Sequence, residues 1–482
     1  MKTRSRPHSL LPAIGLTLLL AGCASYSGIA PVAQLQTPQQ LGASQQDGTD
    51  WPAQDWWQQF DDPILTQLID KALSGNPNLK LAETRISKAG AAAGLAQSSL
   101  GLQVSGDLST ERQRFSEHGI YPPPLGGNVY TLNNASLGAS WEFDYFGRNQ
   151  AALNAAIGNV RAAKADAQAA RELLASNVAR SYFALARLFE QKTIAQASLQ
   201  QRQAIRELVV SRVKAGLDTN VERRQAEGSV PEIERDIAAL DEQISLTRNA
   251  LAALLGDGPQ STATLSPRLA KPLATNSNTT IPADLLGRRA DISAARWRVE
   301  AATQGIAEAK AAFYPNINLK AFVGLNSLGF PDWIEAGSRE YGAGAALHLP
   351  IFDAGRLRAG LRGRTADVDA AIESYNMTLN EAIHDVADQL GSLQSLAIQN
   401  QQQQLASQAA EQAYDLAQQR FRAGLSTYLT VLSAQTNVLA QQRNQTDLQA
   451  RLLDTRIRLI HALGGGFNEA PTAALVGIAN SH

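Results

Sequence analysis

Four stretches of the chain alternate between two kinds of residue with a period of two, which is typical of β-strands with two different faces. In the second half, one face is apolar and consists of Ile317, Leu319, Ala321, Val323 and Leu325, then Ala343, Ala345, Leu347, Leu349 and Ile351. In the first half, the matching residues are Leu102, Val104, Gly106 and Leu108, then Leu137, Ala139, Trp141, Phe143 and Tyr145. The pattern predicts two strand hairpins, over about 101–146 and about 315–353. Strands of about ten residues fit a membrane barrel, and they fit equally well a soluble antiparallel sandwich with one face in a core.

The stretches after each hairpin favour very long helices. They contain no proline, and Ala, Leu, Gln, Arg and Glu dominate them. We expect one helix over about 149–214 and another over about 356–422, each roughly 100 Å long at 1.5 Å per residue. Each ends at a glycine, Gly216 or Gly424, the residue that favours a left-handed helix cap. A second helix then returns with coiled-coil-like packing, over about 219–255 and about 427–463.

The two halves of the chain repeat one another. Gly147-Arg148 matches Gly355-Arg356, and the run Arg-Val-Lys-Ala-Gly-Leu at 212–217 matches Arg-Phe-Arg-Ala-Gly-Leu at 420–425. Each half places a helix before its two strands and a long helical pair after them. This order divides the chain into a signal peptide (1–22), an N-terminal linker (23–60), a first repeat (61–258), a linker (259–281), a second repeat (282–466) and a C-terminal tail (467–482).

Four strands are too few to close a barrel in a membrane. Hydrocarbon offers no water to the backbone, so every N–H and C=O group there needs a protein partner, and single-chain barrels begin at about eight strands. Two chains would supply eight strands and a filled interior, whereas three would supply twelve and leave a lumen. The second face of the strands is polar enough to meet water and carries Ser140, Glu142, Asp144, Asn316, Asn318 and Lys320. We therefore predict an α+β membrane protein whose barrel is completed by several identical chains.

Composition excludes several classes of function. Lys and Arg together number 43 and Asp and Glu 44, so the formal net charge of −1 gives no basic surface for nucleic acid. One cysteine in 482 residues rules out a disulfide framework and a cysteine-based metal site within one chain. The histidines are scattered, and neither His-Glu-x-x-His nor Gly-x-Ser-x-Gly occurs. We therefore expect no enzyme activity, no cofactor and no metal.

The N-terminus has the layout of a secretory signal, with basic residues followed by an apolar run over 10–20. It ends in Leu20-Ala21-Gly22-Cys23, which resembles the lipobox of bacterial lipoproteins. That resemblance implies that the Cys23 thiol receives acyl chains, palmitate among them, and that the mature chain is held on a membrane. Lipoproteins with no aspartate after this cysteine usually continue to the outer membrane, and residue 24 is Ala. The resemblance implies a Gram-negative cell.

Further motifs recur in a fixed order over about residues 23–466. They are Trp57, Phe60, Asp62-Pro63, Leu65, Asn76, Leu79 and Ala82, then Phe143-Asp144, Phe146-Gly147-Arg148, Ile351-Phe352-Asp353-Ala354-Gly355-Arg356 and Leu463-Gly464-Gly465-Gly466. With the lipobox and the tandem repeat, they resemble the TolC-like outer membrane factors, specifically the NodT and OprM type of efflux lipoprotein. The resemblance implies a homotrimer with a 12-stranded outer-membrane barrel continuous with a periplasmic barrel of long helices.

The same resemblance implies partners and a mode of action. The chain would be the passive exit duct of a tripartite system for small molecules, driven by an inner-membrane pump of the RND type through a periplasmic adaptor. The adaptor would meet the two helix-pair tips, which consist of Lys214, Ala215, Gly216, Leu217 and Asp218, and of Arg422, Ala423, Gly424, Leu425 and Ser426. Type I protein secretion and a non-transporting coiled-coil envelope lipoprotein remain as alternatives.

A closed resting state needs a constriction, which relatives place at the periplasmic end. Asp415 lies six residues before Phe421 in the helix that leads to the second tip, and three copies around one axis would form a negative ring. The alternative is that Asp415 is an ordinary solvated charge on a helix surface.

Overall fold

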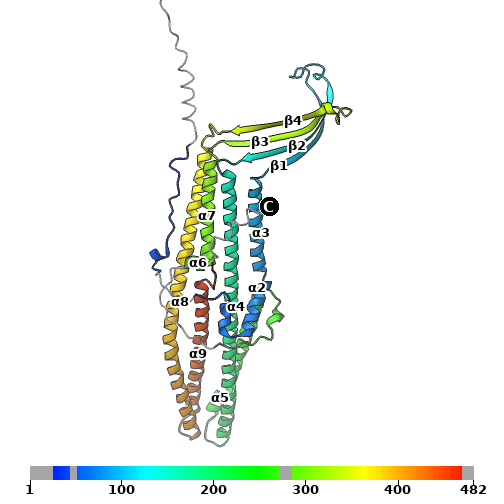
Figure 1. Ribbon diagram of the computed structural model, residues 1–482. Coiled ribbons are helices and arrows are strands. Elements are labelled where there is room, and N and C mark those ends of the chain that lie inside the picture. Colours follow the sequence, from blue (N-terminus) through cyan, green and yellow to red (C-terminus); the bar gives the residue numbers. More distant parts are fainter. Residues whose placement is uncertain (1–24, 44–50, 271–284, 469–482) are drawn as a thin grey trace, which may run out of the picture. The chain divides into compact units, whose positions relative to one another are not determined.

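A computed structural model describes residues 25–43, 51–270 and 285–468 of the chain. The expected signal peptide, Cys23 and most of the C-terminal tail lie outside these residues. Figure 1 shows the elements in chain order. They are η1 (Pro38–Leu41), η2 (Trp56–Phe60), α2 (Pro63–Gly75), α3 (Pro77–Ser98), β1 (Gln103–Arg114), β2 (Val129–Phe143), α4 (Arg148–Lys214), α5 (Asn220–Leu255), η3 (Pro259–Thr262), α6 (Leu285–Arg288), α7 (Ala290–Ala311), β3 (Asn316–Leu328), η4 (Ala336–Ser338), β4 (Arg339–His348), α8 (Arg356–Arg422) and α9 (Tyr428–Ala462).

The order of elements is the same in both halves. A 22-residue helix, α3 or α7, leads into each strand hairpin, and a 67-residue helix, α4 or α8, follows it. The returning helices are α5 and α9. Among the described residues, no helix combines the length and apolarity needed to cross a membrane.

The chain divides into two compact units, each built from both halves of the sequence. The first comprises Met1–Leu35, Arg85–Ala163 and Ala294–Tyr375, and it holds the four strands. The second comprises Gln36–Thr84, Lys164–Ser293 and Asn376–His482, and it holds the helix-pair tips.

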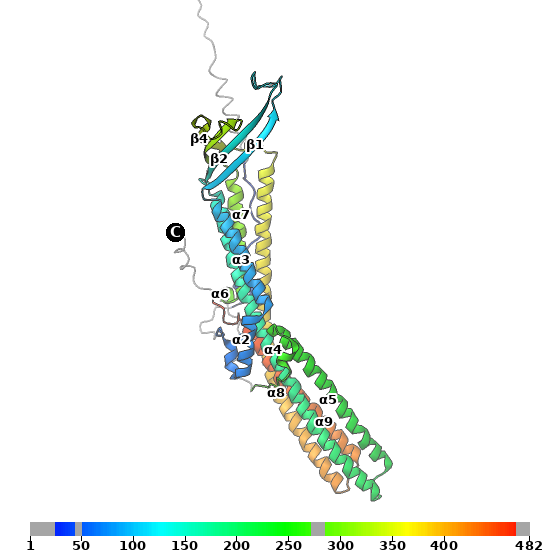
Figure 2. The ribbon, with the colours of Figure 1, turned by 90° about the vertical axis from the view of Figure 1, so that its right-hand side faces the viewer.

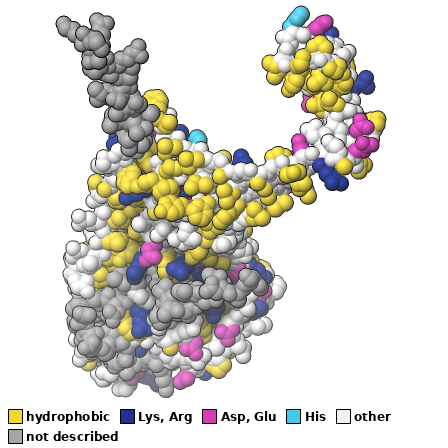
Figure 3. All heavy atoms as spheres, turned by 45° about the horizontal axis from the view of Figure 1, so that its top comes forward, with side chains coloured by type: hydrophobic (Ala, Val, Ile, Leu, Met, Phe, Trp, Pro, Cys, Tyr) yellow, Lys and Arg dark blue, Asp and Glu magenta, His cyan; other side chains and the backbone are white. Residues whose placement is uncertain are grey.

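The four strands form one antiparallel sheet in the order β1-β2-β3-β4, lying side by side in Figure 1. Directly opposed residues share a face of a sheet. Leu137 of β2 is opposed by Gly106 of β1 and by Val323 of β3, so the apolar positions of neighbouring strands gather on one face. Figure 3 shows hydrophobic side chains collected along the sheet.

The apolar face of the sheet is exposed to solvent in the single chain. Val104, Leu108 and Val323 are 65%, 74% and 56% exposed, whereas a sandwich core would bury them against a second sheet. An apolar surface of this kind marks a protein or membrane contact. Within the described chain no second sheet covers this face, so a soluble sandwich formed by one chain is excluded.

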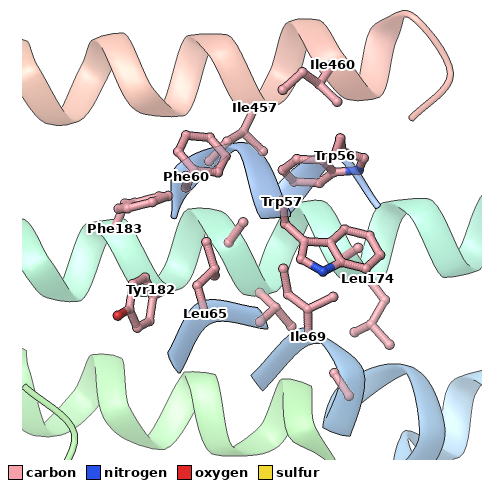
Figure 4. Close-up of a cluster of buried hydrophobic side chains, with 14 of the residues drawn as sticks. Trp56, Trp57, Phe60, Leu65, Ile69, Leu174, Tyr182, Phe183, Ile457 and Ile460 are labelled. Carbon is pink, nitrogen blue, oxygen red and sulfur yellow. The ribbon is translucent and has the colours of Figure 1, made fainter. Parts of the chain in front are cut away.

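The core of the second unit forms where η2 and α2 pack on α4 and α9 (Figure 4). Helix α2 begins at Pro63 because its N-cap, Asp62, accepts hydrogen bonds from the backbone N–H groups of Ile64 and Leu65. The Tyr182 hydroxyl of α4 donates to the other carboxylate oxygen of Asp62 at 2.6 Å. Leu65 and Ile69 are fully buried beneath this bond, so replacing either by Ala would cost about 2–5 kcal/mol.

Candidate functional site

Each strand hairpin passes into its long helix through a junction built on an aspartate and a glycine. The Asp144 carboxylate accepts a hydrogen bond from the Gln150 N–H at 2.8 Å, and the Asp353 carboxylate accepts one from the Leu357 N–H, also at 2.8 Å. This bond keeps the pKa of Asp353 below its usual value. Gly147 and Gly355 have positive φ angles of 73° and 86°, which glycine adopts without steric cost. The junctions therefore explain the recurrence of Asp and Gly in both halves.

The polar face of the sheet is hollowed next to these junctions. A depression of about 480 Å³ is lined by Asn318, Lys320 and His348 among others. Glu142 and Arg148 form an ion pair at 2.9 Å on its wall. A wall of this polarity can face water.

The segment that follows Cys23 lies against α7 and α8 within the first unit. The Tyr26 hydroxyl is 3.1 Å from that of Tyr314, just before β3, and the backbone N–H groups of Val32 and Ala33 donate to Asp369 of α8. Tyr26 is thereby held next to the residues that precede β3, while Val32 and Ala33 lie against α8 further along the helix. Cys23 itself lies outside the described residues.

The two expected tips have the same backbone. In the first, the Leu217 N–H donates to the Arg212 carbonyl at 2.9 Å and the Gly216 N–H to the Val213 carbonyl at 3.0 Å. In the second, Leu425 donates to Arg420 and Gly424 to Phe421, at 2.8 and 3.0 Å. Both are Schellman motifs, with φ angles of 72° at Gly216 and 73° at Gly424.

The side chains of the first tip are tied together by charged bonds. Arg212 donates through Nε and Nη2 to the two carboxylate oxygens of Asp218, at 2.8 and 3.1 Å. The two side chains are only 16% and 10% exposed. Thr219 and Glu222 form a capping box at the start of α5, which satisfies backbone donors there. Leu217 remains 67% exposed at the end of the hairpin.

The second tip lacks both the charged pair and the capping box. Ser426 stands where the first tip has Asp218, and Thr430 stands where it has Glu222. The Ser426 hydroxyl has no hydrogen-bond partner among the described residues, and Thr427 forms no side-chain cap for α9. Leu425 is 69% exposed, like its counterpart Leu217. The two tips thus have the same backbone conformation but differ in how firmly their side chains stabilise it.

The tips belong to one small apolar core, and Figure 2 shows α4, α5, α8 and α9 running together there. Phe421 and Tyr428 are 2% and 0% exposed. The Arg212 guanidinium lies 4.7 Å from the centre of the Phe421 ring, so the charged pair of one tip rests on the aromatic core of the other. The matching runs contain Arg212 and Phe421, but the sequence does not show that these two side chains contact each other. The exchange of Asp218 for Ser426 between the two tips signals that the tips differ.

Asp415 lies on the exposed surface of α8, next to the buried Tyr414. The Tyr414 hydroxyl accepts a hydrogen bond from Gln418 at 2.6 Å. Within the described residues the exposed Asp415 carboxylate forms no ion pair, so it can face a lumen, a neighbouring chain or water. No group of His, Cys, Asp or Glu side chains suited to a metal ion occurs within the described part of the chain.

Comparison with known proteins agrees with this architecture. The family model described as outer membrane efflux protein matches residues 68–257 and 281–465. The chain is 38% identical over 368 residues to the fusaric acid resistance protein FusA of Burkholderia cepacia, covering 74% of this chain and 69% of FusA. It is 34% identical over 413 residues to the multidrug resistance outer membrane protein MdtQ of Escherichia coli O157:H7, covering 82% and 85%.

A solved structure shows the same fold. The outer membrane protein VceC of Vibrio cholerae superimposes with a TM-score of 0.81 at 35% identity, covering 87% of this chain and 100% of VceC. The family expected from the sequence motifs is confirmed, and the chain functions in efflux at the outer membrane. This chain belongs to the outer membrane efflux protein family.

Proposed function

We propose that three copies of the chain form a passive duct through which small molecules leave the cell. The observation that carries the proposal is an open four-stranded sheet with one bare apolar face, one polar face and two unpaired edges, β1 and β4. Pairing β4 of one chain with β1 of the next satisfies both edges in hydrocarbon. Three chains then give twelve strands, which leaves a water-filled lumen lined by the polar faces.

The tips are the proposed docking site for a periplasmic adaptor. Leu217 and Leu425 are the exposed apolar side chains at the two helix turns, and an apolar anchor on a partner helix could pack against them. The charged bonds of the first tip hold its shape before docking, so less order has to be imposed on binding. The second tip, with Ser426 and Thr430, can adjust its side chains to the partner.

A pump of the inner membrane, of the RND type, is the proposed source of energy, and membership of the outer membrane efflux protein family supports this assignment. The resistance named for FusA and MdtQ supports small molecules as cargo. Protein secretion and a non-transporting spacer are not favoured by these relatives.

Acylation of Cys23 is proposed to anchor the chain in the inner leaflet of the outer membrane. The contacts of Tyr26 with Phe313 and Tyr314 support this assignment, because they hold the following segment next to the first residues of β3. Asp415 remains the proposed gate residue, since its carboxylate is exposed on α8 close to the tips.

Single-channel recording of the purified full-length protein in planar bilayers tests the duct. We expect stepwise conductance from a species with the mass of three chains. A trimer that passes no current would refute the duct and favour the spacer, whereas a conducting monomer would refute the shared barrel. Mass spectrometry of the wild type and of Cys23→Ser tests the anchor, which requires acyl mass on the first only.

A further inference from the structure

Charged residues of the two edge strands are sorted by sign between the faces of the sheet. The register places Arg112 opposite Thr131 and Arg339 opposite Leu325. These positions, with Arg114, lie on the apolar face that carries Leu108 and Leu137. The carboxylates in the same part of β1 and β4 all lie on the polar face and belong to Asp107, Glu111 and Glu340.

The three arginines cluster towards one end of the strands. Arg112 and Arg114 close β1 just before its hairpin, and Arg339 opens β4 just after the other hairpin. At the opposite end, where the strands join the helices, the apolar face carries the aromatic residues Trp141 and Phe143 and no basic residue. The outward face is therefore cationic at the hairpin end and aromatic at the helix end.

These guanidinium groups have no acidic partner among the residues that the structure describes. All three side chains are exposed, and within the residues that the structure describes none of them forms an ion pair. Closing the barrel does not supply one, because pairing β4 with β1 of the next chain brings together residues that share a face. The carboxylates of Asp107, Glu111 and Glu340 stay on the lumen side.

We propose that Arg112, Arg114 and Arg339 bind the phosphate groups of anionic lipid in the outer leaflet of the outer membrane. The inference rests on the proposed trimeric duct, which puts the apolar face in lipid and the hairpins on the side away from the periplasmic helices. A guanidinium group offers a planar fork of N–H donors that matches a phosphate. Arg112 and Arg114 are two residues apart on one face, about 7 Å along the strand. This spacing suits either two phosphates or one phosphate that bridges the two guanidinium groups.

Charge complementarity selects lipid phosphate over other occupants. An unpaired guanidinium beside an apolar band has to keep its water or find an anion, and an anionic membrane surface attracts basic residues next to the apolar region. A basic residue at an anionic membrane surface is worth about 1 kcal/mol, which corresponds to about a fivefold change in affinity. Three such residues per chain would hold a shell of lipid around the barrel.

The test uses full-length trimers in phosphatidylethanolamine vesicles containing lipopolysaccharide, whose lipid A part carries phosphate. Lipopolysaccharide that remains bound after detergent extraction and purification is measured by its sugar content, and the temperature of trimer dissociation is measured in parallel. The variants are Arg112→Gln, Arg114→Gln and Arg339→Gln, alone and combined, together with the triple Arg→Lys variant. The matched control is Lys320→Gln, which removes an exposed cation from the lumen face of the same sheet.

We expect about a fivefold loss of bound lipopolysaccharide for each single Gln variant, a larger loss for the triple variant, and no loss for Lys320→Gln. The triple Lys variant should keep most of the lipid, because it keeps the charge, and dephosphorylated lipid should bind all proteins equally weakly. Retention of lipid by the triple Gln variant, or equal loss in the control, would overturn the proposal. Conductance in planar bilayers reports the duct separately, so a conducting triple variant that has lost lipid separates the two conclusions.

Discussion

The ion pair between Arg212 and Asp218 sets the stability of the first tip, and Asp218→Asn tests this directly. The substitution keeps the size and shape of the side chain and removes its charge. Arg212 would keep its place over the Phe421 ring but lose the bidentate bond at 2.8 and 3.1 Å. The second tip, which has Ser426 at this position, provides an internal reference in the same molecule.

The magnitude follows from the burial of the pair. Hydrogen bonds to charged groups contribute about 1.5–3 kcal/mol, and the 16% and 10% exposure of these side chains places the bond above the range of a surface ion pair. Because the tip ends in solvent, we take the lower part of that range, about 2 kcal/mol. A change of 2 kcal/mol raises the equilibrium constant for local opening about 30-fold.

Hydrogen exchange measured by mass spectrometry reads this opening in peptides that cover each tip. In Asp218→Asn we expect amides around 212–218 to exchange about 30-fold faster, while those around 420–426 keep their rate. Ser426→Ala, the control at the matching position, should leave both tips nearly unchanged. A double-mutant cycle with Arg212→Met should show coupling between the two positions, and unchanged exchange in Asp218→Asn would refute the assigned role of the pair.

Three further outcomes are expected. Gly216→Val and Gly424→Val each force a β-branched residue into a φ near 72°, at a cost of about 1–2 kcal/mol. Either substitution should weaken adaptor binding in a pull-down assay, whereas Gly228→Ala in the α5 helix should not. Glu172 of α4 is buried, and burial raises its pKa from 4.5 to about 7. The stability gained from its neutral form is therefore full below pH 4.5 and is lost as the pH rises through 7. Glu172→Gln should reduce the fall in melting temperature between pH 5 and pH 8. Asp415→Lys should raise the leak current or change cation selectivity in planar bilayers, and an unchanged current would remove Asp415 as the gate.

Local periodicity and composition were sufficient to predict the four strands and the long helices. The uninterrupted helix formers after each hairpin predict α4 and α8, which end at Lys214 and Arg422 as the glycine caps indicate. The alternation of period two predicts the strands, because it reports which face each side chain takes. The same alternation cannot tell a membrane face from a soluble core, since both are apolar. The exposure of Val104 and Leu108 in the folded chain resolves this choice.

Contacts between distant segments could not be predicted from one sequence. Trp56 and Trp57 pack on α4 and α9, more than a hundred positions away in the chain, and no local pattern specifies such a partner. Arg212 likewise resembles any basic residue near a helix C-terminus until the fold brings Phe421 beneath it. The partner of a side chain is set by tertiary packing, which periodicity does not encode.

The sequence repeat also explains how two tips with the same backbone conformation can differ in stability. The Schellman motifs at the two tips depend on glycine and on main-chain bonds, which both halves retain. The side chains that would stiffen a tip, Asp218 and Glu222, occur only in the first half. In the proposed trimer, firmly held and more adaptable tips therefore alternate around the periplasmic end. An adaptor that docked at the tips, as proposed, would meet two kinds of site, and the firm tip would fix its register while the adaptable tip accommodated movement of the helices.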